Sequence, residues 1–459
     1  MKNFLIALSV PFILTGCGGG GDVATSTVAL SQPTTYTIST DLSAVSYPVS
    51  FTNSTQLLTT SNPCNLNLPN VTIPKEWMGN FPLPTIKNAP LQRNLVRGVS
   101  LKDIMLHDNP GFILDSGCTG NLQAELSKTF NRLKALGVEQ ITIPQWHWLT
   151  KDISNNWYIS KAEDTYGSLI DSDLAHLVNV AHSVGIKVIV LNQVQAMIDS
   201  PAGTPYIPTQ THVNRVKWFD AFRPFMTERS SFFQSIGVDG IEVGCGACIF
   251  SDVGDASTSA IELALVNYLN IINDVKSRFN GKLLMYINPL LYSETFRNKI
   301  DMIALYSVTG QLTAEQNSKL TVESYKTFIQ DNLYKTQGMQ YWISLGKPLV
   351  IPFEIQSRAN ALTEPGYVEE TGCTESIGSI SYSSVCIQKQ QKPDFSIQAI
   401  VFQATLEAIN EVSWPAGSIV MPQQYWQTDV MNPYTAYPNI ASSFRNKPAE
   451  QIIKAWYKK

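Results

Sequence analysis

The sequence predicts an α/β fold, a (β/α)8 TIM barrel with a flexible N-terminal tether. From about residue 94, short apolar runs alternate with segments whose apolar residues recur at helical spacing, and such alternation predicts a parallel sheet. Eight such units over roughly 330 residues fit a TIM barrel with enlarged loops. A doubly wound open sheet is the alternative, but no Gly-x-Gly-x-x-Gly motif opens a helix after a strand, which weakens a dinucleotide-binding interpretation.

The individual elements follow from local pattern. Strands are predicted at short apolar runs between turn residues, over 95–101, 138–148, 186–191, 238–244, 282–287, 299–306, 348–354 and 418–425. Helices are predicted where apolar residues recur every three or four positions, over 122–136, 171–184, 213–235, 260–279, 322–344 and 395–412. Gly137, Gly185 and Gly237 stand where three of these helices should end, because glycine commonly terminates a helix.

The N-terminus resembles a targeting segment. Lys2 precedes a short apolar stretch over 4–14, which is too short to span a bilayer as a helix. Leu14-Thr15-Gly16-Cys17 resembles a bacterial lipobox, which implies a signal peptide over 1–17, cleavage before Cys17 and lipidation of its thiol. The alternative is an ordinary secretory signal with a chance cysteine. Gly18 rather than aspartate follows Cys17, which implies a cell-envelope protein of the outer membrane, either periplasmic or surface-exposed.

Composition divides the remaining chain into regions. Residues 18–62 are rich in Gly, Ser and Thr and predict a flexible linker, whereas 63–93 are proline-rich and predict an extended lead-in. The barrel is expected over 94–435, and a C-terminal helix or tail over 436–459.

Six cysteines remain after Cys17, an even number that suggests disulfides in an exported protein. They are Cys64, Cys118, Cys245, Cys248, Cys373 and Cys386. Fifteen full pairings are possible. Proximity favours Cys373–Cys386 and Cys245–Cys248, and elimination leaves Cys64–Cys118. A zinc site at Cys245 and Cys248 is the alternative, but no second cysteine pair or His-x-x-x-His partner accompanies it.

Charge and motifs narrow the function classes. The net charge of −4 is small, and no basic block suggests nucleic acid. No His-Glu-x-x-His metal motif and no Gly-x-Ser-x-Gly elbow is present. We therefore expect no cofactor and no metal, a monomer, and contact with the membrane only through the lipid anchor.

Glu354 is the strongest candidate for chemistry, because it closes the buried run 348–354 and TIM barrels carry catalytic groups at the C-terminal ends of strands. Other strand ends carry aromatics and amides, which suit a sugar because aromatic faces stack on pyranose rings and amides bond hydroxyls. The candidates for sugar binding are Trp146, Trp148, Asn192, Tyr306 and Trp426. Trp146 and Trp148 share a strand face; the alternative is that they pack between barrel and helices. His107 and His147 could also touch a ligand.

Ordered segments resemble glycoside hydrolase family 113, the β-mannanase-like group of retaining TIM-barrel glycosidases. The matching segments are 182–188, 243–244, 285–288, 300–306, 347–355 and 398–408. Lys347-Pro348 through Phe353-Glu354-Ile355 is similar to the family's Lys-Pro…Thr-Glu-Ile-Gly, whose glutamate is the nucleophile. Met285-Tyr286-Ile287-Asn288 is similar to its fifth strand, which implies that Tyr286 and Asn288 orient the sugar.

One departure from the family concerns the acid/base glutamate. The family's Val-Gly-Thr-Glu becomes Val243-Gly244-Cys245-Gly246, so a glycine stands at the glutamate position. Glu242 lies on the same strand face but about 13 Å lower, and Arg97 is its expected partner if it is buried. Loop acids are further candidates, although each is also a plausible solvated charge: Asp252, Asp255, Glu294 and Asp429.

The leading expectation is a glycoside hydrolase-like lipoprotein acting on a polysaccharide or oligosaccharide. Glu354 would be the nucleophile or general base, and Glu242 or a loop aspartate the acid. A catalytically inactive glycan-binding or structural envelope lipoprotein on a degenerate barrel is the alternative, since fold does not guarantee activity. A glycan-processing partner in envelope or exopolysaccharide assembly is a third.

Overall fold

The computed structural model describes most of the barrel and part of the lead-in. The described residues are 75–86, 90–101, 122–151, 156–160, 169–196, 212–244, 258–335, 338–364, 367–368, 373–375, 386–388, 392–425, 440, 442–445 and 447–458. The predicted signal peptide over 1–17, with Cys17 as its predicted lipidation site, and the predicted linker over 18–62 lie outside these ranges.

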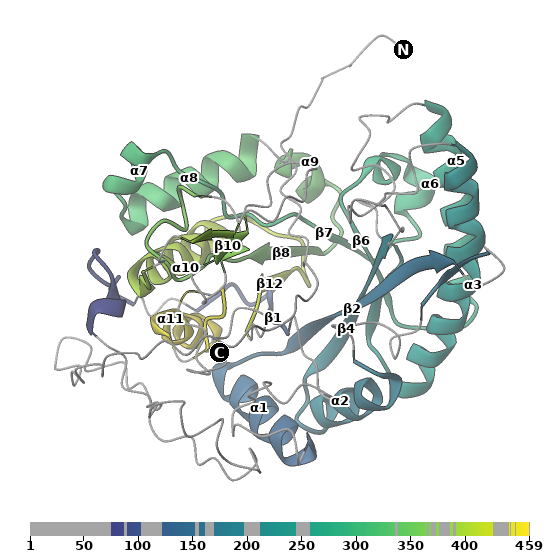
Figure 1. Cartoon of the computed structure of the whole chain (residues 1–459), viewed down its shortest axis with the longest axis horizontal. Coiled ribbons are helices and arrows are strands. Elements are labelled where there is room, and N and C mark those ends of the chain that lie inside the picture. Colours follow the sequence, from purple (N-terminus) through teal and green to yellow (C-terminus); the bar gives the residue numbers. More distant parts are fainter. Residues whose placement is uncertain are drawn as a thin grey trace.

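Eight parallel strands close into a barrel, as the sequence predicts (Figure 1). The closing contact is the pairing of β1 with both β2 and β12, which excludes the open doubly wound sheet. Around the barrel the strands are β1 (Val96–Ser100), β2 (Gln140–Lys151), β4 (Lys187–Ala196), β5 (Gly240–Glu242), β6 (Lys282–Tyr286), β7 (Met302–Ala304), β8 (Leu349–Phe353) and β12 (Ile419–Pro422).

The strand register gives the barrel a shear of eight. Ser100 of β1 pairs with Thr142, and successive partners lead through Ile189 and Gly240 to Lys282. When the same series of paired residues is followed across β7, β8 and β12, it returns to β1 at position 92. This is eight residues before Ser100, where the series began. Eight strands with a shear of eight are the geometry of a TIM barrel. From each strand to the next around the barrel, the paired residue therefore lies about one residue lower along the barrel axis.

Helices surround the barrel (Figure 1). They are α1 (Leu122–Leu136), α2 (Asp171–Ser183), α3 (His212–Ile236), α5 (Thr258–Lys276), α6 (Glu294–Arg297), α7 (Ala314–Ser318), α8 (Val322–Lys335), α9 (Met339–Ser344), α10 (Phe395–Asn410) and α11 (Pro448–Tyr457), with the 3-10 helices η3 (Lys75–Met78) and η5 (Pro289–Tyr292). The predicted stop after α1 is confirmed: Gly137 has φ 93°, and a Cβ there would lie 2.3 Å from the carbonyl oxygen of Tyr457. Among the described helices, none is long and apolar enough to cross a membrane.

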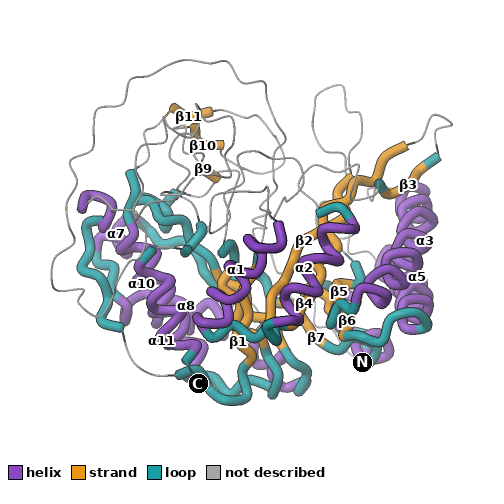
Figure 2. Tube along the Cα trace, turned by 90° about the horizontal axis from the view of Figure 1, so that it is seen from below, coloured by secondary structure: helices purple, strands orange, loops and turns teal. Residues whose placement is uncertain are grey.

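Some elements differ from the prediction. The single helix predicted over 322–344 is two helices, α8 and α9, because Gly338 adopts a left-handed conformation at the start of α9. The antiparallel strand β3 (Trp157–Ile159), which pairs with the end of β2, was not predicted. A small sheet of β9 (Tyr367–Val368), β10 (Cys373–Glu375) and β11 (Cys386–Gln388) was also missed; Figure 2 shows it apart from the barrel strands.

Two apolar layers hold the fold together. Inside the barrel, a cluster fills the space between the strands: Ile189, Leu191, Leu284, Met302, Ala304, Val350, Ile419 and Met421. Outside it, a much larger cluster packs the opposite strand faces against the helices. Helix α10 is buried along almost its whole length, between α8 and α11. Burial of this kind is the main stabilising contribution in such a fold.

The lower end of the barrel carries a repeated hydrogen-bond pattern. The residue just before every second strand accepts a hydrogen bond from a backbone N–H of the preceding strand. These pairs are Glu139 with Arg97 (3.2 Å), Asp239 with Val188 (2.8 Å), Asp301 with Leu283 (2.9 Å) and Ser418 with Leu349 (3.0 Å). We call these four acceptors the lower rim. They satisfy backbone donors at strand starts, which would otherwise lose a partner.

The described part of the lead-in packs against the outside of the barrel. The ring of Trp77 lies edge-on to Phe395 at the start of α10, with 6.1 Å between centroids. The backbone N–H of Asn80 donates to Asp394, the residue that caps α10. Further along, the N–H of Leu91 donates to the carbonyl oxygen of Trp456 in α11. The chain thus contacts α10 and α11 before it enters β1.

Candidate active site

The inner face of the barrel changes from apolar to polar toward the C-terminal ends of the strands. Above the apolar cluster, alternate residues that continue the same strand faces are Gln193, Glu242, Tyr286, Tyr306 and Glu354. We call these five residues the mouth. TIM barrels carry their active sites at this end, so the mouth is the candidate active site.

Glu354 stands at the predicted place, directly after β8. All five residues of β8 are buried, and Glu354 itself is half-buried. Its backbone carbonyl accepts a hydrogen bond of 2.7 Å from Oγ1 of Thr309, whose hydroxyl also lies 2.8 Å from that of Ser307. The loop after β7 therefore holds the backbone of Glu354 in place at the barrel end.

Glu242 is a buried carboxyl in the barrel interior. Only 1% of it is exposed, and its Oε2 accepts a hydrogen bond of 2.8 Å from Nε2 of Gln193. Burial raises the pKa of Glu242 well above its ordinary value, although the bond from Gln193 opposes this. The prediction that Arg97 pairs with Glu242 is wrong. Arg97 faces outward and its Nη1 contacts Glu139 at 3.3 Å, because it alternates with the inward-facing positions of β1.

Glu242 lies deeper than Glu354. It pairs with Leu284, which pairs with Met302, and this line reaches β8 at position 348. Each of the three steps from β5 to β8 descends by about one residue because of the shear. The residue of β8 at the same height as Glu242 is therefore position 351, three residues before Glu354. At ~3.3 Å per residue this is about 10 Å along the strand. Glu242 is therefore a carboxyl beneath the mouth opening, not one facing Glu354 at the same level.

Tyr306 and Tyr286 form an aromatic pair beside these carboxyls. Their rings stack with centroids 6.2 Å apart and planes 29° apart. Tyr306 is 37% exposed, but its hydroxyl points inward and donates to the carbonyl oxygen of Ile287 at 3.0 Å. Burial of that hydroxyl raises the pKa of Tyr306 to about 12, and the nearby charge of Glu242 adds to the effect.

Tyr268 reaches the same region from helix α5 and was not predicted. It is fully buried, and burial followed by the charge of Glu242 raises its pKa well above the ordinary value. Gly244, just after β5, has φ 156°, and a Cβ there would lie 2.5 Å from Cε1 of Tyr268. Only glycine allows this approach of strand and helix. A residue on a surrounding helix gives no such signal in sequence.

Strands β2 and β4 extend beyond the barrel and form a raised wall on one side of the mouth (Figure 2). Trp146 pairs with Gln193 across this wall, and Trp148 with Gln195. Between the tryptophans, His147 is fully buried, contacts the carbonyl oxygen of Ser160 at 3.1 Å and packs on Phe225 of α3. Burial, followed by Arg229, lowers the pKa of His147 to about 3. The suggested ligand contact of His147 is thus wrong, and the sugar contacts of Trp146 and Trp148 stay predictions.

Asn192 and Asn288 have structural contacts where sugar contacts were predicted. Asn192 is fully buried, and its Nδ2 donates to the backbone carbonyl of Glu242 at 3.1 Å. Asn288 caps η5 by accepting from the N–H of Leu290 at 2.8 Å, and its amide donates to the carbonyl of Tyr286 at 2.7 Å. The amide that enters the mouth is instead Gln193, one residue after Asn192.

Several predicted site residues lie outside the described part of the chain. These are His107, Trp426, Asp252, Asp255, Asp429, Gly246, Cys64, Cys118, Cys245 and Cys248. Glu294 is described and lies exposed at the start of α6. Cys373 and Cys386 lie on the paired strands β10 and β11, two positions apart in register, so their disulfide stays a prediction. No group of three or more metal-binding side chains occurs among the described residues.

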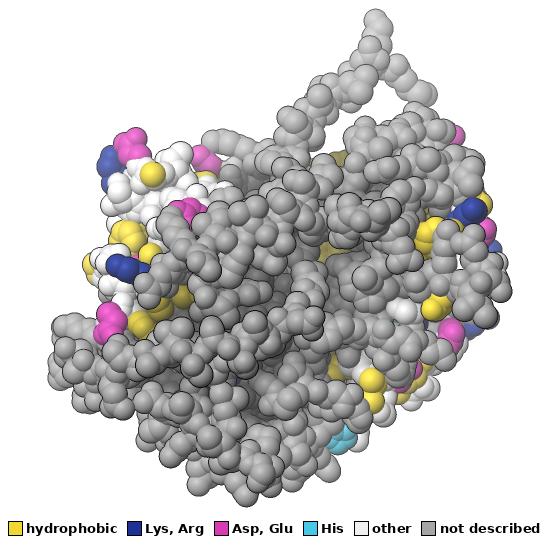
Figure 3. Space-filling view, in the orientation of Figure 1, with side chains coloured by type: hydrophobic (Ala, Val, Ile, Leu, Met, Phe, Trp, Pro, Cys, Tyr) yellow, Lys and Arg dark blue, Asp and Glu magenta, His cyan; other side chains and the backbone are white. Residues whose placement is uncertain are grey.

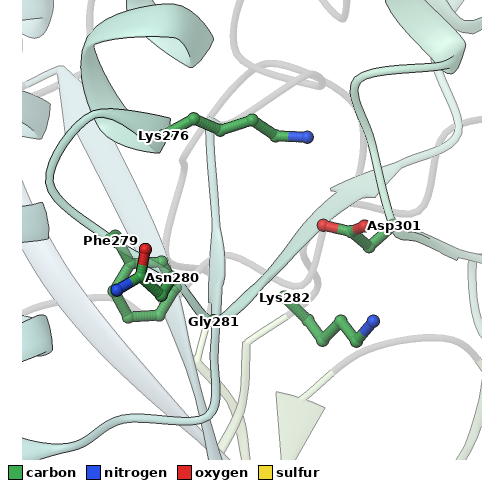
Figure 4. Close-up of a pocket in the computed structure, with 6 residues that line it drawn as sticks. All are labelled: Lys276, Phe279, Asn280, Gly281, Lys282 and Asp301. Atoms are coloured by element: carbon green, nitrogen blue, oxygen red, sulfur yellow. The ribbon is translucent and has the colours of Figure 1, made fainter.

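A hollow of about 240 Å³ lies at the opposite end of the barrel (Figure 4). It is lined by Lys276, Phe279, Asn280, Gly281, Lys282 and Asp301. Asp301 belongs to the lower rim and is engaged with a backbone N–H. In Figure 3, the charged side chains of the described residues lie scattered along the edges of the view, with both signs present. Neither feature competes with the mouth as the candidate active site.

Comparison with solved structures bears on the fold. A GH113 β-mannanase from Alicyclobacillus acidocaldarius, solved in complex with ManMIm, aligns over 79% of this chain and 97% of its own, with 14% identity and a TM-score of 0.50. The barrel shares the fold of this enzyme. A second GH113 β-1,4-mannanase aligns over 79% and 98% of the two chains with 15% identity and a TM-score of 0.49. No protein-family model matches the sequence, and no curated protein matches it.

The predicted resemblance to family 113 is therefore confirmed in fold. At 14% identity the likeness does not transfer the role of any residue. What the site can do must be argued from its own geometry, which combines one half-buried carboxyl, one deeply buried carboxyl and an aromatic pair within one barrel end.

Proposed function

We propose that this protein acts on a polysaccharide or oligosaccharide as a glycoside hydrolase. The observation that carries the proposal is the change along the inner barrel face, from a closed apolar cluster to a mouth with Glu354, Tyr306 and Gln193. A carboxylate supplies a nucleophile or base, the exposed ring of Tyr306 offers a stacking surface, and the amide of Gln193 can bond hydroxyl groups.

In this proposal Glu354 is the nucleophile or general base. Burial raises the pKa of Glu242 well above its ordinary value, which favours the protonated form that a general acid needs. Because Glu242 lies deeper than Glu354, it can act only on a group that enters below the level of Glu354. Trp146, Trp148 and Trp426 are proposed as further sugar contacts on the sequence pattern alone. Tyr286 supports Tyr306 by stacking. Linkage and sugar remain to be found by substrate screening.

The test is hydrolysis of activated aryl β-glycosides and of β-linked polysaccharides by the full chain. If Glu354 acts as a base, Glu354→Gln should lower kcat by about 10²–10⁴-fold, while sugar affinity is retained. Glu262→Gln, at an exposed position on α5 that carries no proposed role, is the matched control and should leave kcat unchanged.

The second candidate is a glycan-binding protein without hydrolytic activity. It is favoured by one observation: the second described carboxyl of the mouth, Glu242, lies about 10 Å deeper than Glu354. Sugar binding that survives Glu354→Gln, with no bond cleavage in any β-linked substrate, would establish this candidate and end the enzyme proposal.

We further propose that Cys17 is lipidated and anchors the protein in the outer membrane. The lipobox-like Leu14-Thr15-Gly16-Cys17 supports this, since an acyl anchor holds a protein at a membrane without a spanning helix. Metabolic labelling with a radioactive fatty acid should mark the wild-type chain and not Cys17→Ala. Labelling of both, or of neither, would contradict the anchor.

A further inference from the structure

A pair of exposed tyrosines lies on η5 and α9, outside the barrel strands. Tyr292 ends η5 and is 62% exposed, the most exposed large apolar side chain among the described residues. Tyr341 in α9 is 38% exposed. Their rings stack with centroids 5.6 Å apart and planes 29° apart. We call this pair the tyrosine platform.

The platform is held in place from beneath and from the side. Trp342, which is buried, lies under it, with its ring 5.5 Å from Tyr292 and 4.9 Å from Tyr341. Nη1 of Arg297 donates to the carbonyl oxygen of Leu291 at 2.9 Å and to the hydroxyl of Tyr341 at 3.4 Å. These contacts restrict the rings before any ligand arrives, which lowers the entropy lost on binding.

The size and chemistry of the platform favour a sugar over a protein partner. Two aromatic side chains of ~150–250 Å² each, exposed by about half, offer on the order of 200 Å². A stable protein interface needs about 800 Å² on each partner. One or two pyranose rings match the smaller area, because their C–H faces cover an aromatic ring. Arg297 and the tyrosine hydroxyls can then bond the ring hydroxyls at the edge.

We propose that the tyrosine platform is a second glycan-binding site, separate from the barrel mouth. It goes beyond the proposed function, since it requires no catalysis. A polysaccharide long enough to reach both sites would gain from the raised local concentration of chain at the mouth. A short oligosaccharide would not gain in this way, so the platform should matter only for long glycans.

The test is affinity gel electrophoresis of the full chain in gels containing galactomannan, glucomannan, xylan or β-glucan. Loss of one stacking contact in Tyr292→Ala should weaken binding of at least one polysaccharide by about 2–10-fold. Tyr292→Trp should retain or strengthen binding. Val266→Ala, at an equally exposed position on α5 with no aromatic neighbour in the platform, is the matched control and should bind like wild type.

The outcomes separate this site from the mouth. Weaker polysaccharide binding by Tyr292→Ala, with unchanged cleavage of a small aryl glycoside, supports the platform. The same weakening in a protein that cleaves nothing also supports it, while the hydrolase proposal fails. Unchanged binding in Tyr292→Ala, or a wild-type chain that binds no polysaccharide, overturns the platform. Tyr306→Ala reports the mouth independently, because it should also weaken binding of oligosaccharides too short to reach both sites.

Discussion

The two ends of the barrel use polar side chains in opposite ways. At the lower rim, Glu139, Asp239, Asp301 and Ser418 occupy equivalent positions and each accepts from one backbone N–H. The five mouth residues also follow the inner strand faces, but each makes a different kind of contact. Gln193 bonds to Glu242, Tyr286 stacks on Tyr306, and the hydroxyl of Tyr306 bonds to a backbone carbonyl. The hydrogen bond of the lower rim recurs at every second strand, whereas no contact recurs from strand to strand at the mouth.

This difference indicates that the lower rim contributes to stability and the mouth to function. A lower-rim side chain satisfies a donor at a strand start and so stabilises the barrel. The mouth holds buried ionisable groups, Glu242 and the hydroxyls of Tyr268 and Tyr306, whose charged forms are disfavoured there. Such groups cost stability and are typical of sites with a function. Variants at the lower rim should therefore change the free energy of unfolding, and variants at the mouth should change activity or sugar binding.

The largest expected effect is on activity, from Glu354→Gln at the mouth. As proposed above, kcat should fall by about 10²–10⁴-fold, while the free energy of unfolding, measured by urea denaturation, changes by less than about 0.5 kcal/mol. A loss of stability that accompanies the loss of activity would show that Glu354 belongs with the fold and would remove the distinction between the two ends.

The next effect is a pH dependence of stability caused by Glu242. Its pKa is raised on folding, so the folded state binds the proton more tightly than the unfolded state does. Stability is then greatest below the ordinary pKa of 4.5 and falls as pH rises toward the folded pKa. The largest slope from one group is about 1.4 kcal/mol per pH unit.

Glu242→Gln isolates this effect, because glutamine keeps the shape of the side chain and cannot lose a proton. Urea unfolding at pH 5 and pH 8 should show that the variant gains stability relative to wild type as pH rises. A constant difference between the two proteins over this range would mean that Glu242 does not titrate abnormally. Glu294→Gln, at the exposed start of α6, gives the baseline.

Sequence pattern predicted the barrel well and the side-chain partners poorly. Glu354 was found because it closes an apolar run, and that run forms strand β8, which Glu354 directly follows. Asn192 was predicted at this strand end and Gln193 was not, because the pattern of a single strand does not reveal which of its faces points into the barrel. Arg97 was paired with Glu242 for the same reason. Tyr268 was missed because it enters from a helix at the close approach to Gly244.

A smaller effect is expected from Gly244→Ala, which tests how rigid the mouth is. The added methyl group would lie 2.5 Å from Cε1 of Tyr268, so strand or helix must shift. Overpacking of this kind costs about 1–3 kcal/mol, and denaturant titration measures it. Tyr268→Leu in the same chain should recover part of the loss, since it removes the ring that meets the methyl group. Without recovery, the strain lies in the backbone of Gly244 rather than in this contact.

The smallest effect is expected at the lower rim, from Asp239→Ala. Oδ2 of Asp239 accepts from the N–H of Val188 at 2.8 Å and lies 2.9 Å from Nε2 of His182. Loss of the acceptor leaves the Val188 donor without this partner and should cost about 1–2 kcal/mol in the free energy of unfolding. Asp239→Asn keeps an acceptor oxygen and should cost less. Sugar binding should be unchanged in both, because Asp239 lies at the end of the barrel opposite Glu354; weaker sugar binding with unchanged stability would reverse the assignment of the two ends.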